Sequence, residues 1–123
     1  MDAILNDYAS NDFCKIAIDK SGTKWIASYK NGVIAFNENS SVGFKKMTQG
    51  EEVGNLPSID VRAIAVDNRS QVWIGTNRGL RVLSSTGAYN NDDQMKANAI
   101  IFEENGLARE LLQDQYISDI AVN

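Results

Sequence analysis

The sequence predicts an all-β fold built from a repeated unit, and two observations carry this prediction. Segments 14–28 and 62–76 align without gaps, so that Asp19 and Asp67 stand 48 positions apart, and a third copy opens at Ile117. Turn signals divide each copy into short runs that are apolar on both sides, as strands buried on both faces are. Repeats of this size, made of such strands, are typical of blades stacked around an axis. The sequence therefore predicts a fragment of a β-propeller, with about two four-stranded antiparallel blades plus the first strand of a third.

The expected strands follow the same order in each copy. We expect first strands at 14–18 and 61–66, second strands at 24–28 and 72–76, and third strands at 33–36 and 80–83. Fourth strands are expected at 42–47 and at 99–103, where the run Ala99-Ile100-Ile101-Phe102 is rich in residues that favour strands. The predicted boundaries within one partial propeller, 1–123, are about 12–48 for the first blade, 59–104 for the second and 116–123 for the start of the third.

An aspartate opens the turn between the first and second strands of each copy. Asp19 and Gly22 stand at the first and fourth positions, which are the preferred ends of a type I turn. Ser70 replaces the glycine in the second copy, so we expect more strain there. Calcium ligation is the alternative role for Asp19 and Asp67, but neither opens an Asp-x-Asx-x-Asx-Gly loop. Turn capping is therefore the interpretation that we adopt.

Trp25 and Trp73 occupy the same place in the two copies, and each precedes an isoleucine. We expect both rings in the core between blades, although an aromatic ring can also stack on a sugar or a cation. The lone Cys14 is expected to be buried and inert. The segment 84–98 lengthens the second copy and contains Asn90-Asn91-Asp92-Asp93, so it is expected to be an exposed, mobile loop.

The composition argues against several classes of function. The chain has no histidine, which removes the commonest general base and metal ligand. Adjacent acids such as Glu103-Glu104 point to opposite faces of a strand and do not form a catalytic pair. We therefore expect no enzyme activity, no metal and no cofactor. The net charge of −4 argues against a nucleic-acid partner, and the apolar runs are too short to span a membrane.

The run 72–80, VWIGTNRGL, is preceded by Leu56-Pro57 and by Ile64-Ala65-Val66-Asp67. With these flanks it resembles the two-component regulator propeller repeat of bacterial envelope proteins. The segment 104–122 is similar to the large surface subunit of the type IX (Por) secretion system. These resemblances imply a periplasmic or cell-surface protein of Bacteroidetes, active in secretion-complex attachment or in glycan sensing by a hybrid two-component sensor. The partners they imply are envelope proteins or an anionic glycan or lipopolysaccharide.

Loop geometry predicts the binding residues. In an antiparallel blade, the loop after the second strand and the connection to the next blade emerge on one face, where propellers usually bind partners. The candidates on this face are Tyr29, Lys30, Asn31, Asn77, Arg78 and Arg109. The cations would receive an anionic glycan or an acidic protein loop, and Tyr29 would supply a stacking surface. Ordinary solvated loop residues would give the same pattern.

Two alternatives remain open at this point. The chain can be part of a propeller lyase or hydrolase whose active site lies in other blades. Two blades also cannot close a ring, which needs about four. We therefore expect either self-association or the remaining blades of a longer chain to cover the outer faces, where Ile16, Ile18 and Phe102 are expected.

Overall fold

The computed structural model describes residues 13–49, 54–90, 95–112, 115–117 and 119–121. Over these residues the fold is all-β, as predicted, with one short 3-10 helix and no α-helix. The strands of the first unit are β1 (Phe13–Ile18), β2 (Lys24–Ser28), β3 (Gly32–Phe36) and β4 (Phe44–Met47). The remaining elements are β5 (Val61–Val66), β6 (Val72–Thr76), β7 (Gly79–Leu83), η2 (Thr86–Asn90), β8 (Ile101–Glu104) and β9 (Leu107–Glu110).

The first four strands form one antiparallel sheet in the order β1-β2-β3-β4, which confirms the strands expected for the first blade. Trp25 lies opposite Ala17 on one side and Ala35 on the other, so two small residues leave room for the indole. β2 and β3 are buried along almost their whole length, because each has a neighbour on both edges and on at least one face.

The second sheet has three strands, β5-β6-β7, and the predicted fourth strand at 99–103 is wrong. On the other edge of β7, Asn98 is the one described residue that pairs with it, through two backbone hydrogen bonds of 2.8 and 2.7 Å with Val82. The following residues form β8, which pairs with β9 as a separate hairpin. The physical reason is the Asn105-Gly106 turn, whose φ angles of 54° and 80° suit the two-residue turn of a tight hairpin. Phe102, expected on the outer face of the second blade, therefore lies on this hairpin.

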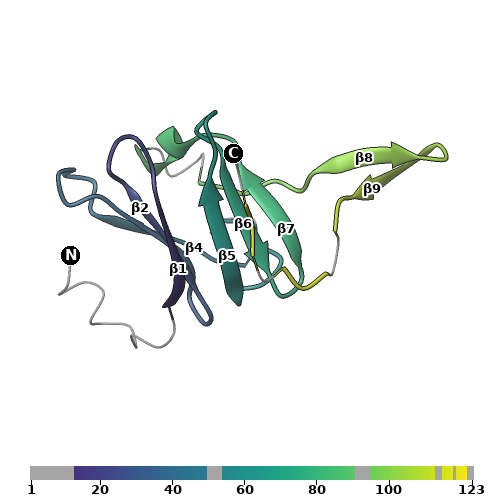
Figure 1. The fold of residues 1–123 in the computed structure, drawn as a ribbon, viewed down its shortest axis with the longest axis horizontal. Coiled ribbons are helices and arrows are strands. Elements are labelled where there is room, and N and C mark those ends of the chain that lie inside the picture. Colours follow the sequence, from purple (N-terminus) through teal and green to yellow (C-terminus); the bar gives the residue numbers. More distant parts are fainter. Residues whose placement is uncertain (1–12, 50–53, 91–94, 113–114, 118, 122–123) are drawn as a thin grey trace.

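The core lies between the two sheets, which stand face to face with the hairpin projecting from the second (Figure 1). The first sheet contributes Trp25, Ala27 and Val33, and the second contributes Ile74 and Leu83, all fully buried. β1 and β5, the first strands of the two units, also lie beside each other. This packing of one blade face on the next is the one that the repeat predicts.

The segment 84–98 is expected from the sequence to be an exposed loop, but its described residues, 84–90 and 95–98, are partly buried. Residues 91–94 lie outside the described part of the chain. Tyr89 and Ala97 are buried, at 2% and 0% exposure. The Tyr89 hydroxyl donates to the carbonyl of Gly43 and accepts the backbone N–H of Asn37 at 3.2 Å. Both partners belong to the first unit. The insertion is therefore a strap that fastens the second unit to the first, because its apolar side chains enter the core while its polar residues face outward.

The repeated aspartates cap their turns, as predicted. Asp19 Oδ1 accepts the backbone N–H groups of Ser21 and Thr23 at 2.9 and 3.0 Å. Asp67 does the same in the second unit, at 2.9 Å to both Arg69 and Gln71. Ser70 adopts a φ of 61°, the left-handed region in which a side chain is unfavourable, where Gly22 has 86°. The side chain of Cys14 lies outside the described part of the structure.

Candidate functional site

Three backbone hydrogen bonds connect the loops along one end of the sheets, and two of them join successive units. Gly32 donates to the carbonyl of Ile59 at 2.9 Å, and Asn77 donates to that of Asp60 at 3.1 Å. Ile117 donates to the carbonyl of Thr76 at 2.8 Å. These bonds bring the β2–β3 loop, the entry to β5, the β6–β7 loop and the segment 115–117 together. We call this end the loop face.

Arg62 is the centre of the loop face. Its guanidinium carbon lies 4.1 Å from the ring centroid of Tyr29 and 5.6 Å from that of Tyr116. Asp60 accepts two hydrogen bonds from the same guanidinium, at 2.5 Å from Nε and 3.0 Å from Nη2. The bond to Asp60 is the main cause that raises the pKa of Arg62 above its ordinary value. The cation is therefore permanent, and it connects side chains from three successive units.

The structure gathers five of the six predicted residues on the loop face. Tyr29 is half-buried against Arg62, and Lys30 is exposed. Asn31 Oδ1 accepts a hydrogen bond of 3.2 Å from Lys46 Nζ. Asn77 is half-buried, and Arg78 is exposed. Whether these residues bind a ligand stays a prediction.

Arg109 does not lie with the others. It stands on β9 in the projecting hairpin (Figure 1), where its guanidinium is 3.8 Å from Glu104 and half exposed. The sequence placed it in a connection between blades, but the Asn105-Gly106 turn folds this segment into a hairpin instead. Arg109 is therefore no part of the loop face.

Sequence reasoning missed Arg62, Asp60 and Tyr116. A usable signal existed, because residues two apart in an extended chain point to the same side, so Asp60 and Arg62 are placed to pair. Arg62 also stands where the first copy has Cys14. Such a change from a neutral residue to a charged one at an otherwise matched position marks a feature that is not part of the repeat.

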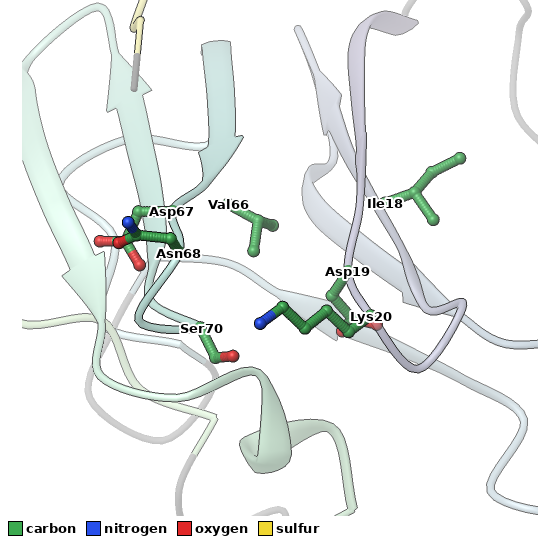
Figure 2. Close-up of a pocket in the computed structure, with 7 residues that line it drawn as sticks. All are labelled: Ile18, Asp19, Lys20, Val66, Asp67, Asn68 and Ser70. Atoms are coloured by element: carbon green, nitrogen blue, oxygen red, sulfur yellow. The ribbon is translucent and has the colours of Figure 1, made fainter. Parts of the chain in front are cut away.

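A groove lies at the opposite end of the sheets, between the turns that follow β1 and β5. It is lined by Ile18, Asp19, Lys20, Val66, Asp67, Asn68 and Ser70, and Lys20 extends from one turn toward Ser70 of the other (Figure 2). The two carboxylates are already engaged, because Oδ2 of each accepts the indole N–H of a tryptophan at 3.0 and 2.8 Å. The carboxylates of Asp19 and Asp67 therefore have few acceptor positions left for a ligand in the groove.

Residues 55–78, from the linker before β5 through the β6–β7 loop, match the family model of the two component regulator propeller. These residues are similar to a two-component regulator propeller repeat. The propeller also resembles PorZ of Porphyromonas gingivalis, described as an essential bacterial surface component of the type-IX secretion system. The match has a TM-score of 0.70 at 20% identity, and it covers 94% of this chain and 18% of PorZ. This likeness shows the β-propeller fold.

The chain is also similar to a histidine kinase, Histidine kinase P4 of Formosa agariphila. It is 29% identical over 60 residues, which are 49% of this chain and 4% of the kinase. The chain thus spans a small part of both relatives. In the described part of the chain, no helix is long and apolar enough to cross a membrane.

Proposed function

We propose that the chain is a non-catalytic binding module of a bacterial envelope protein and that its loop face binds an anionic glycan, such as the polysaccharide of a lipopolysaccharide. The observation that carries this proposal is the stack of Tyr29, Arg62 and Tyr116, in which the guanidinium of the second unit holds one aromatic ring from the first unit and one from the third on one surface.

The chemistry of the loop face suits an acidic sugar. The Tyr116 side chain is 57% exposed, so one ring face remains open to stack on the apolar face of a sugar ring. Asp60 already neutralises Arg62, which leaves Arg62 to hold the rings in position. Lys30 and Arg78 are exposed at the same end of the sheets and would attract the carboxylates or phosphates of the ligand.

A binding role also agrees with the composition. The chain supplies no histidine, so the usual acid–base and nucleophilic sites would need residues from elsewhere. The likeness to PorZ supports a role in secretion-complex attachment, and the likeness to a histidine kinase supports glycan sensing. Both roles place the module at the cell surface or in the periplasm, with envelope proteins or anionic glycans as partners.

The test measures binding of polygalacturonate oligomers, with neutral dextran oligomers as the comparison, by isothermal titration calorimetry. We expect the acidic oligomer to bind, and the charge reversals Lys30→Glu and Arg78→Glu to weaken it about tenfold each, because each removes a charge-assisted contact. Tyr116→Ala should weaken binding similarly. Lys20→Glu is the matched control, because it makes the same change at the opposite end of the sheets. Equal binding of dextran, or equal loss in the control, would contradict the proposal.

A further inference from the structure

We propose that the β8–β9 hairpin is a docking arm, which binds an extended segment of a partner protein along the outer edge of β8. The partner segment carries basic residues followed by apolar ones. This site is separate from the loop face, and it involves a protein partner rather than a glycan.

The arm exposes large apolar side chains. Ile101 and Leu107 are each 60% exposed and Phe102 is 39% exposed, and all four residues of β8 are open to solvent. A two-stranded ribbon alone is only marginally stable in water. Apolar side chains gathered on such a ribbon are typical of a surface that a partner covers.

The base of the arm is nevertheless fixed to the second sheet. Arg81 on β7 forms an ion pair of 3.2 Å with Glu110 on β9, and the two side chains are only 16% and 14% exposed. Leu111 donates a backbone hydrogen bond of 2.7 Å to Ile100, which extends the ribbon toward this anchor. The arm is thus held in one orientation before a partner arrives, which lowers the entropic cost of binding.

The outer edge of β8 is open to strand addition. The carbonyl of Ile100 accepts the hydrogen bond from Leu111 and therefore faces the β9 side of the ribbon. Because successive residues of a strand direct their N–H and C=O groups to opposite edges, those of Ile101 and Glu103 face away from β9. Within the described residues, β8 pairs with no strand other than β9. An extended segment can therefore add to this edge through main-chain hydrogen bonds.

The sequence of β8 determines the chemistry of that segment. Ile101 and Phe102 are followed by Glu103 and Glu104, so the edge is apolar at one end and acidic at the other. An antiparallel segment would place basic residues opposite the glutamates and apolar residues opposite Ile101 and Phe102. A second copy of β8 fits poorly, because it would set glutamates against each other or against apolar residues.

The experiment measures the fluorescence anisotropy of a labelled peptide with the sequence Lys-Lys-Val-Val in the presence of the chain. We expect binding that Glu103→Pro weakens at least tenfold. Proline at position 103 removes an N–H that points away from β9. Proline is tolerated in edge strands where the missing N–H would face solvent, so the hairpin should still form. The double variant Glu103→Lys and Glu104→Lys should also lose the basic peptide and gain a Glu-Glu-Val-Val peptide.

A second probe covers the case in which the proline variant misfolds. The same basic peptide, N-methylated on alternate residues, is tested with the wild-type chain. Its binding should be at least tenfold weaker than that of the unmethylated peptide. Equal binding of the methylated peptide would overturn the strand-addition geometry, and equal binding of the basic peptide by the charge-reversed variant would overturn the partner chemistry. A dimer in light scattering that Glu103→Pro abolishes would show that a second copy occupies the arm instead.

Discussion

At the scale of single residues, the repeated aspartate and tryptophan act as one device. One carboxylate oxygen of Asp67 holds the turn before β6, and the other accepts the indole N–H of Trp73 at 2.8 Å. Asp19 and Trp25 make the same contacts in the first unit. The six-residue spacing is therefore explained by geometry, since the strand after the turn brings the indole back to the aspartate.

This device predicts how stability depends on pH. The hydrogen bond from Trp73, followed by that from Gln71, lowers the pKa of Asp67 below its ordinary value of 3.8. A lowered pKa means that the contribution is fully present above about pH 4 and is lost as the pH falls through the folded-state pKa. We expect the melting temperature to fall in this acidic window, and to fall less steeply in Asp67→Asn. Parallel curves for the two proteins would contradict the role of Asp67.

The two tryptophans should differ in their contributions to stability. Trp25 is fully buried between the sheets, whereas Trp73 lies on the face of the second sheet turned away from the first and is only partly buried. Trp25→Ala should cost about 3–5 kcal/mol in the free energy of unfolding, as for large aromatic residues removed from cores. Trp73→Ala should cost clearly less in this chain. Urea denaturation measures both, and equal losses would show that the two faces are equally covered.

At the scale of elements, the strap formed by 84–98 holds the two units together, although its polar composition predicts an exposed loop. Tyr89→Phe would leave the ring in place but remove the hydroxyl that bonds to Asn37 and Gly43. We expect a loss of about 1–2 kcal/mol, because the buried N–H of Asn37 and the half-buried carbonyl of Gly43 each lose a hydrogen bond. Tyr29→Phe is the matched control, since its ring contact with Arg62 needs no hydroxyl, and its effect should stay within about 0.5 kcal/mol. Chemical denaturation that ranks the two variants in the reverse order would contradict the strap.

The same elements show what the sequence can and cannot predict. The repeat identified seven strands and the turn-capping role of Asp67, because patterns that recur at matched positions reflect the same packing twice. It failed at 99–103, where strand propensity was correct but the partner was decided by the local Asn105-Gly106 turn. It failed at Tyr89 and at Arg62 for a common reason. Both residues contact parts of the chain that are distant in sequence, and only the pairing of Arg62 with Asp60 is visible in the local pattern.

At the scale of the whole molecule, the described end of the chain returns to its beginning. Lys15 on β1 forms an ion pair of 2.9 Å with Asp119, which is 104 positions later and belongs to the third copy of the repeat. The hydrogen bond from Lys15 is the main cause that lowers the pKa of Asp119. Ile117 also lies against the second sheet, where a Cβ added to Gly75 would approach its Cγ2 to 2.4 Å. β1, β5 and the start of the third copy thus lie close together, as the first strands of successive blades do in a propeller.

Within the described residues, the first sheet presents an apolar surface to a neighbouring unit. On the face of the first sheet turned away from the core, Ile16, Ile18 and Phe44 are 54%, 61% and 42% exposed. In a propeller the next blade packs on such a face, and without one the burial of apolar area favours contact between chains.

We expect the apparent mass in gel filtration with light scattering to rise with protein concentration. The double variant Ile16→Thr and Ile18→Thr should shift this rise to higher concentration, because it removes apolar surface without touching the core between the sheets. Glu103→Pro in the arm should leave it unchanged, which separates association through the blade face from association through the arm. A wild-type chain that stays monomeric at every concentration would mean that this face is stable in water and needs no neighbouring blade.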